Sequence, residues 1–130
     1  MDGVSYYDDS KGTNVASTIF ACKAMTENTI LILGGVDKGC EFDDLFTVLP
    51  SKIKGIVVVG EAKDKIYACA KKYGYKNIVI AGSFKEAVLH ARLMAKRGWN
   101  VLLSPACASF DMFKNYEERG KAYADIVRSL

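Results

Sequence analysis

Three short polar segments contain the residues of this 130-residue chain that could bind a small charged molecule. Residues 8–14, 34–39 and 104–120 each follow a short run that has strand character. Lys11 and Lys38 supply cations and Ser109 supplies a hydroxyl group in these segments. Cations, hydroxyl groups and the free N–H groups of a helix start are typical partners of carboxylates and phosphates. The residue types and their spacing therefore predict the binding of an anionic small molecule.

Lys38 and Ser109 each have a structural interpretation beside the functional one. Lys38 lies between glycines, where it could contact a carboxylate or phosphate or remain a solvated loop lysine. Ser109 could hold a carboxylate at the start of the final helix, or only cap that helix with Asp111 assisting. Gly34 and Gly35 would let backbone approach a ligand closely.

The remaining polar residues are equally open to two interpretations. Asp8 and Asp9 could bind a ribose hydroxyl or a magnesium ion, or end a strand and cap a helix. Lys11 and Thr13 could contact an anion or form a solvated turn. A nucleophilic role for Cys107 is disfavoured because no histidine lies near it in the sequence. We expect Tyr116 in the core or a pocket wall, and Arg119 in a surface ion pair.

Strand and helix patterns alternate along the chain and predict an α/β fold. Strands are expected at 4–7, 29–33, 55–59, 77–81 and 99–103; helices are expected at 14–25, after residue 39 as far as Pro50, at 62–72, from 82–83 to 97–98, and at 113–130. Thr13 or Asn14 would cap the first helix. This order predicts a Rossmann-like three-layer sandwich, in which helices cover both faces of a mainly parallel sheet of five or six strands.

Composition narrows the class of protein. The net charge of +3 is mild and no basic stripe occurs, so nucleic acid is not an expected partner. No apolar run is long enough to cross a bilayer, and we expect a cytoplasmic monomer. Its four cysteines are widely spaced and predict reduced, mostly buried thiols rather than a zinc site. Neither a Gly-x-Gly-x-x-Gly turn nor a Walker phosphate loop is present.

Together the polar segments resemble the C-terminal domain of the Mur ligases, which add amino acids to the peptidoglycan precursor. The resemblance rests on residues 9–14, on residues 33–35 with Lys38, and on residues 104–111 continuing through 113–116 to 119–120. They occur in the family's order and at compatible spacing, and the last segment is long and specific. The resemblance spans residues 1–130 as a single domain, the amino-acid-binding domain. It implies that an N-terminal UDP-binding domain and a central ATPase domain belong to the same enzyme.

The nearest resemblance within the family is to the member that joins D-glutamate to UDP-N-acetylmuramoyl-L-alanine. It implies that ATP phosphorylates the carboxylate of the nucleotide substrate and that the D-glutamate amine attacks the acyl phosphate. ATP and Mg²⁺ would be bound mainly by the central domain. This chain would position D-glutamate and close over ATP, would contain no catalytic residue or metal ligand, and would be inactive alone.

The resemblance also assigns roles to individual residues. Ser109 and the backbone of Phe110 would hold one carboxylate of D-glutamate, and Lys38 and Thr13 the other. Tyr116 would pack beside this substrate, at a position where the family often has phenylalanine. The cofactor-binding residues would be Asp9, on the ATP ribose, and Lys11, at the nucleotide or product interface. Gly12 stands where alanine is common.

Two alternatives remain at this point. The chain could be a stand-alone Rossmann-like module that binds a small anion. It could also belong to another amide ligase of the same superfamily, specific for a different amino acid. A Gly-Lys-Thr or Gly-Lys-Ser loop upstream in the same reading frame would exclude the stand-alone module.

Overall fold

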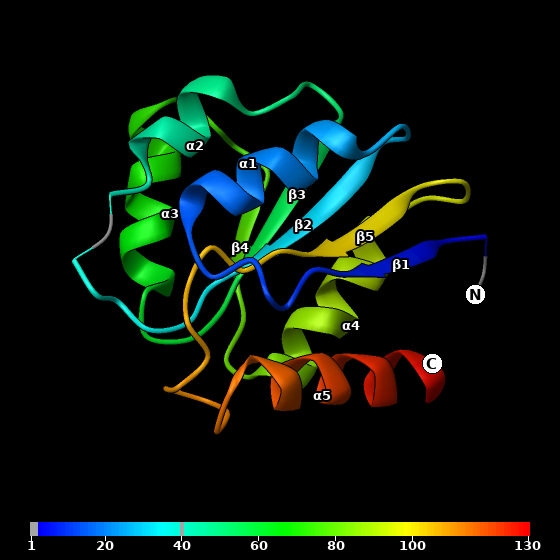
Figure 1. The fold of residues 1–130 in the computed structure, drawn as a ribbon. Helices are drawn as coiled ribbons and strands as arrows, with labels where there is room; N and C mark the ends of the chain where they lie inside the picture. Colours follow the sequence, from blue (N-terminus) through cyan, green and yellow to red (C-terminus); the bar gives the residue numbers. More distant parts are fainter. Residues whose placement is uncertain (1–2, 40) are drawn as a thin grey trace.

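The structure is a computed structural model that describes residues 3–39 and 41–130. Strands and helices alternate along it, as the sequence predicts (Figure 1). The strands are β1 (Ser5–Asp8), β2 (Thr29–Leu33), β3 (Ile53–Val58), β4 (Ile78–Ile80) and β5 (Asn100–Leu103). The helices are α1 (Val15–Ala24), α2 (Asp43–Val48), α3 (Lys63–Lys72), α4 (Phe84–Met94) and α5 (Tyr116–Arg128).

All five described strands are parallel and lie in the order β1-β5-β2-β3-β4. Strand composition follows this order. The central strand β2 is buried at every residue and apolar at all but Thr29, because helices cover both of its faces. The edge strand β1 has the sequence Ser-Tyr-Tyr-Asp and is largely exposed. The parallel sheet of the predicted α/β fold is therefore confirmed.

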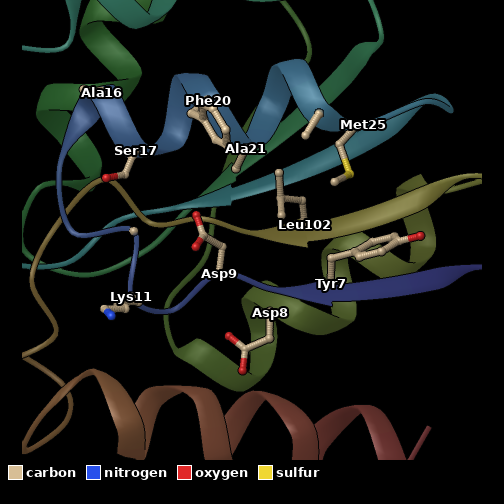
Figure 2. Close-up of a pocket in the computed structure, with 12 residues that line it drawn as sticks. Tyr7, Asp8, Asp9, Lys11, Ala16, Ser17, Phe20, Ala21, Met25 and Leu102 are labelled. Carbon is tan, nitrogen blue, oxygen red and sulfur yellow. The ribbon is translucent and has the colours of Figure 1, made fainter.

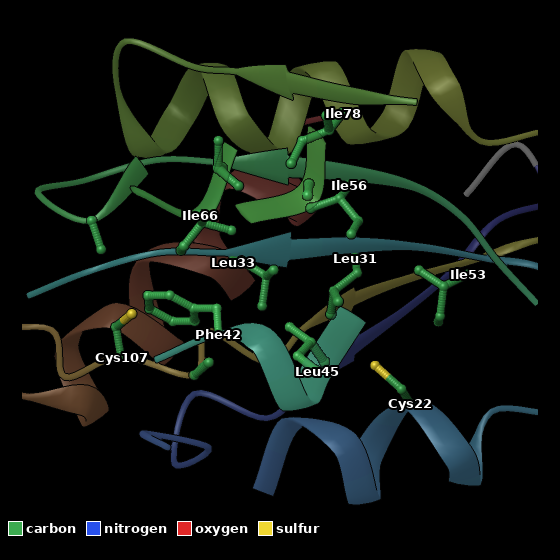
Figure 3. Packing of buried hydrophobic residues seen from close by; sticks show 14 of the residues in the cluster. Cys22, Leu31, Leu33, Phe42, Leu45, Ile53, Ile56, Ile66, Ile78 and Cys107 are labelled. Atoms are coloured by element: carbon green, nitrogen blue, oxygen red, sulfur yellow. The ribbon is translucent and has the colours of Figure 1, made fainter. Parts of the chain in front are cut away.

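Helices cover both faces of the sheet, which confirms the three predicted layers (Figure 1). Helices α1, α2 and α3 lie on one face, where Cys22, Leu45 and Ile66 pack against Leu31 and other strand residues (Figure 3). Helices α4 and α5 lie on the other face, where their residues pack against the opposite sides of the strands. Each inner strand thus contributes alternate side chains to two separate apolar clusters.

The strand order also places the binding edge. The chain leaves β1 and β2 toward the α1–α3 face, whereas it leaves β5, which lies between them, toward α5 on the other face. Ligands of open α/β sheets bind where neighbouring connections diverge in this way, outside the carboxyl ends of the strands. The loops after β1, β2 and β5 are the three polar segments identified from the sequence.

Three predicted elements differ from the structure. Helix α4 ends at Met94 rather than at residues 97–98. The predicted strand 77–81 is only the three-residue β4, which lies at the sheet edge and pairs with β3 alone. The final helix begins at Tyr116 rather than at residue 113. Asn115 caps it by accepting a hydrogen bond from the Glu118 N–H at 2.9 Å. Residues 109–113 instead form a turn in which the Ser109 carbonyl accepts from the Met112 and Phe113 N–H groups.

Candidate functional site

The three polar loops meet at the carboxyl edge of the sheet, as the strand order requires. Gly34 N–H donates to the Pro105 carbonyl at 3.0 Å, and Val36 N–H donates to the Ala108 carbonyl at 2.9 Å. The Ala106 N–H donates to the carbonyl of Gly12 at 2.9 Å. The loop after β5 therefore contacts both of its neighbours through backbone hydrogen bonds, and the predicted convergence of the loops is confirmed.

Gly34 and Gly35 are required by contacts within the protein. Their φ angles of 132° and 151° lie in the region that favours glycine. A Cβ on Gly34 would lie 1.7 Å from the Val59 carbonyl oxygen, and one on Gly35 would lie 2.2 Å from the Ala108 oxygen. The sequence predicted that these glycines let backbone approach a ligand; the structure shows that they let loops approach one another.

Lys38 and Phe110 lie together although they are far apart in the sequence. The Lys38 ammonium is 5.5 Å from the centroid of the Phe110 ring, a cation–π distance. Both side chains are exposed, and 65% of Phe110 is accessible. Ser109 directly precedes Phe110, so the loop after β2 and the loop after β5 present a cation and a hydroxyl-bearing turn to the same region.

Ser109 is the one predicted binding residue whose side chain is buried and makes no hydrogen bond within the described structure. It is 1% exposed, and its Oγ has no partner among the described residues. A buried hydroxyl without a partner costs about 1–3 kcal/mol. The idea that Ser109 caps the final helix is wrong, because Asn115 does so. Because α5 begins at Tyr116, the free N–H groups of its first turn do not belong to the carboxylate site predicted at Ser109.

Asp111 also has a different role from the predicted one. Its Oδ2 accepts a hydrogen bond from the Glu61 N–H at 2.8 Å, at the turn between β3 and α3. The Glu61 carboxylate in turn accepts from the Asp37 N–H at 2.8 Å. Asp111 thus links the loop after β5 to the loop after β3, rather than assisting the start of α5.

The loop after β1 is held by buried polar side chains. Ser104 Oγ donates to Asp9 Oδ2 at 2.7 Å, while the Ser104 carbonyl accepts from the Thr18 hydroxyl at 2.9 Å. Asp8 accepts hydrogen bonds from the N–H and hydroxyl groups of Ser10. The cap of α1 is Asn14, one of the two predicted candidates, and neither Asp8 nor Asp9 caps that helix.

Arg119 is the residue whose environment the sequence interpretation missed. The expected surface ion pair is wrong, because the side chain is 0% exposed. Its Nη1 donates to the Cys107 carbonyl at 3.0 Å and its Nη2 donates to the Ser10 carbonyl at 2.7 Å. Burial lowers the pKa of the guanidinium below its usual value. The sequence contains one signal for the burial of Arg119. The residue four positions later, on the same helical face, is the aromatic Tyr123, which is also buried.

Two cavities adjoin the loop after β1. One, of about 730 Å³, lies between α1 and strands β1 and β5, and Asp9 and Lys11 lie toward one end of it (Figure 2). Apolar side chains line much of the rest: Tyr7, Phe20, Ala21, Met25 and Leu102. The second cavity, of about 480 Å³, lies between this loop and α5, and Tyr116 lines it together with Asp9 and Lys11.

A family model described as "Mur ligase, glutamate ligase domain" matches residues 1–107. The chain belongs to this family. Curated relatives named UDP-N-acetylmuramoylalanine--D-glutamate ligase are similar along its whole length. The relative from Caldanaerobacter subterraneus subsp. tengcongensis is 45% identical over 132 residues, 100% of this chain and 29% of the relative. The relative from Lachnospira eligens is 47% identical over 129 residues, 99% of this chain and 29% of the relative. The chain thus spans less than a third of their length.

A solved structure shows the same fold. A domain described as part of a UDP-N-acetylmuramate:L-alanyl-gamma-D-glutamyl-medo-diaminopimelate ligase from Haemophilus ducreyi 35000HP superimposes with a TM-score of 0.57. The superposition covers 99% of this chain and 89% of that domain, at 14% sequence identity. At this identity the likeness supports the fold of the Mur ligase domain and carries no information on its substrate.

The structure divides the predicted site residues of this Mur ligase domain into two groups. Lys38, Phe110 and Ser109 belong to one region, on the loops after β2 and β5. Asp9, Lys11 and Tyr116 line the cavity beside α5. The seventh predicted site residue, Thr13, is exposed in the loop of Lys11, and its N–H donates to the Lys11 carbonyl at 2.9 Å. The structure places Tyr116 beside the residues predicted to bind nucleotide.

Other reactive side chains are buried or dispersed. Burial raises the pKa of the Cys22 thiol to about 12, and Cys107 is buried as well. Cys22 and Cys69 are free thiols, whereas Cys40 lies outside the described residues. Within residues 3–39 and 41–130, no three metal-ligating side chains are grouped together and no helix is long and apolar enough to span a membrane.

Proposed function

We propose that this chain is the amino-acid-binding domain of an ATP-dependent ligase that joins D-glutamate to UDP-N-acetylmuramoyl-L-alanine. Membership of the glutamate ligase domain family and the names of relatives about 45% identical along the chain support this assignment. The remaining two domains of the enzyme would bind the uridine nucleotide and most of the ATP. We expect the isolated chain to form no amide.

The observation that carries the proposal is the meeting of Lys38 with the turn that contains Ser109 and Phe110. D-Glutamate has two carboxylates, and this region offers two kinds of partner. The Lys38 ammonium would pair with one carboxylate, assisted by Thr13, and the Ser109 hydroxyl and Phe110 N–H would donate to the other. Hydrogen bonds to charged groups are worth about 1.5–3 kcal/mol each.

The burial of Ser109 adds a condition to this proposal. Since Ser109 is 1% exposed, a carboxylate reaches its hydroxyl only when the turn or its exposed neighbour Phe110 moves. The hydroxyl has no partner among the described residues, so such a movement breaks no described hydrogen bond of this side chain. Substrate binding would then give the Ser109 hydroxyl a hydrogen-bond partner and remove the cost of leaving it unpaired. Closure of the domain over the rest of the enzyme would accompany this step.

The other half of the site fits a nucleotide. Asp9 could accept a hydrogen bond from a ribose hydroxyl, Lys11 carries a mobile cation suited to phosphate, and both line the two cavities. ATP supplies the phosphoryl group that activates the carboxylate of the nucleotide substrate. The side chains of this domain would hold the amine of D-glutamate against the activated carbon, and positioning of this kind accounts for up to roughly 7–11 kcal/mol in intramolecular models.

The test is a kinetic assay of the full-length ligase with D-glutamate, L-glutamate and other amino acids. We expect D-glutamate to be the preferred substrate. Lys38→Ala and Ser109→Ala should each raise the KM for D-glutamate about tenfold or more, the loss of one charge-assisted hydrogen bond. Lys23→Ala, an exposed lysine on α1, serves as the control. Unchanged KM values for D-glutamate in both site variants would disprove the site, and preference for another amino acid would disprove the substrate.

A further inference from the structure

Arg119 combines complete burial with the lack of an acidic partner. Within the described residues no carboxylate lies at salt-bridge distance from its guanidinium, and its Nε makes no hydrogen bond. Burying a cation in this way is costly unless other groups replace its hydration. Two backbone carbonyls do so in part, those of Ser10 and Cys107. Asp111 and Asp8 contribute favourable charge from a greater distance.

The two carbonyls belong to different halves of the site. Ser10 lies between Asp9 and Lys11, on the loop predicted to contact nucleotide. Cys107 lies two residues before Ser109, on the loop predicted to contact the amino acid. The two hydrogen-bonded positions are separated by 109 and 12 residues from Arg119 in the sequence, so one side chain joins three distant segments.

The neighbouring residue brings α5 against the same loop. A Cβ on Gly120 would lie 2.9 Å from Asp8 Oδ2 and 3.1 Å from Ser10 Oγ. The absence of a side chain at this position lets the helix approach the loop after β1 closely enough for Arg119 to reach both carbonyls. The planar guanidinium suits this task, because its donors point in fixed and different directions.

We propose that Arg119 is a positioning residue that fixes the nucleotide loop and the amino-acid loop relative to one another. The proposal rests on the function assigned above and goes beyond it, because Arg119 is buried and is none of the residues predicted to touch a substrate. It implies that the loss of Arg119 weakens the binding of ATP and D-glutamate together. The UDP-N-acetylmuramoyl-L-alanine site, which would lie mainly on other domains, should be unaffected.

The kinetic test compares Arg119→Met and Arg119→Lys in the full-length ligase with Arg128→Met. Arg128 lies on the same helix, is exposed, and pairs only with the nearby Asp125 among the described carboxylates. We expect Arg119→Met to raise the KM for ATP and the KM for D-glutamate each by about tenfold. Arg119→Lys should give a smaller rise in both, because a single ammonium cannot hold two divergent carbonyls in the same way. The KM for the uridine nucleotide should change less than about twofold.

Hydrogen exchange tests the same proposal without reference to activity. In Arg119→Lys, the amides of Gly12 and Ala106, which bond within and between the two loops, should exchange faster than in the wild type. Amides of the central strand β2 should keep their protection. Arg119→Lys is the variant of choice if Arg119→Met does not fold, and Arg128→Met should match the wild type.

Different results would overturn the proposed function and the positioning role of Arg119. A wild-type ligase that does not accept D-glutamate would overturn the proposed function, while the exchange experiment would still decide the role of Arg119. Folded Arg119 variants that keep both KM values and normal exchange at Gly12 and Ala106 would overturn the positioning role alone. A loss of thermal stability without a change in either KM would also overturn it, because it would indicate support of the fold only.

Discussion

The loops after β1 and β2 present the two predicted cations of the site in different ways. The loop that carries Lys11 is fixed by buried polar groups, since Ser104 donates to Asp9 and Arg119 donates to the Ser10 carbonyl. The loop that carries Lys38 is held at its base by backbone hydrogen bonds of Gly34 and Val36, whereas residues 37–39 are exposed and are held by surface contacts of Asp37 with Glu61 and Lys65. One cation therefore stands on a rigid support and the other on a short exposed segment.

This contrast suits two different tasks. If the loop after β1 binds a nucleotide as proposed, the hydrogen bonds around Asp9 would provide a preformed surface for it. An amino acid must enter and be enclosed, so a cation on an exposed segment beside a buried hydroxyl can adjust to it. Segments with few buried contacts open most readily, and the region around Lys38 has this character. The base of that loop is nevertheless tightly packed.

The largest effect is expected at that base, from Gly34→Ala. A Cβ would lie 1.7 Å from the Val59 carbonyl oxygen at a φ of 132°, so both the backbone conformation and the neighbouring strand would have to change. We expect the free energy of unfolding to fall by at least about 3 kcal/mol. Gly74→Ala is the matched control, with a φ of 77° and open space around it, and should cost about 1 kcal/mol. Denaturant titration measures both; equal losses would show that the base of the loop is not rigid.

Ser104→Ala tests the support of the nucleotide loop. It removes the donor to Asp9 and leaves a partly buried carboxylate without this partner, so stability should fall by about 1–3 kcal/mol. In the full-length ligase the KM for ATP should rise more than the KM for D-glutamate. Thr47→Ala, which removes an exposed hydroxyl bonded to the Asp44 carbonyl, should change stability by less than about 0.5 kcal/mol. An equal rise in both KM values would indicate that Ser104 supports the whole edge rather than one loop.

Much of the fold follows from the sequence because each central strand is a short apolar run between turn residues. Strand β2 occupies the predicted residues 29–33, and the other inner strands begin or end within two residues of their predictions. The helix start was misplaced because Ser109 and Asp111 are residue types that favour a helix start. Asn115 followed by Glu118 is a capping signal that would have placed it correctly.

Only those features of the site that follow from the strand topology could be predicted from the sequence. Parallel strands bring their carboxyl ends to one edge, so the meeting of the three loops follows from the element order. Whether Ser109 is exposed and what Arg119 contacts depend on packing between residues distant in the sequence, which periodicity does not report. An arginine on an amphipathic helix is usually at the surface, and here Gly120 brings the helix close enough to bury it.

The smallest effect is expected from Lys65→Met, which tests how firmly the exposed residues 37–39 are held. The Gly39 N–H and then Lys65, whose ammonium lies 3.3 Å from Asp37 Oδ1, lower the pKa of the Asp37 carboxyl. A pKa lowered by folding adds stability above the ordinary aspartate pKa, and this is lost as the pH falls through the lowered value. Lys65→Met should therefore raise the pKa of Asp37 only part of the way, because the Gly39 hydrogen bond remains. The acid loss of stability from this group, which begins near the unfolded aspartate pKa in both proteins, should be smaller in the variant and complete at a higher pH. NMR titration of the Asp37 carboxyl, with Lys63→Met as control, measures the shift. If the segment is loosely held, Lys65→Met should change the KM for D-glutamate by less than about twofold. A large rise in this KM would show that the Asp37–Lys65 ion pair fixes Lys38, and the contrast between the two loops would not hold.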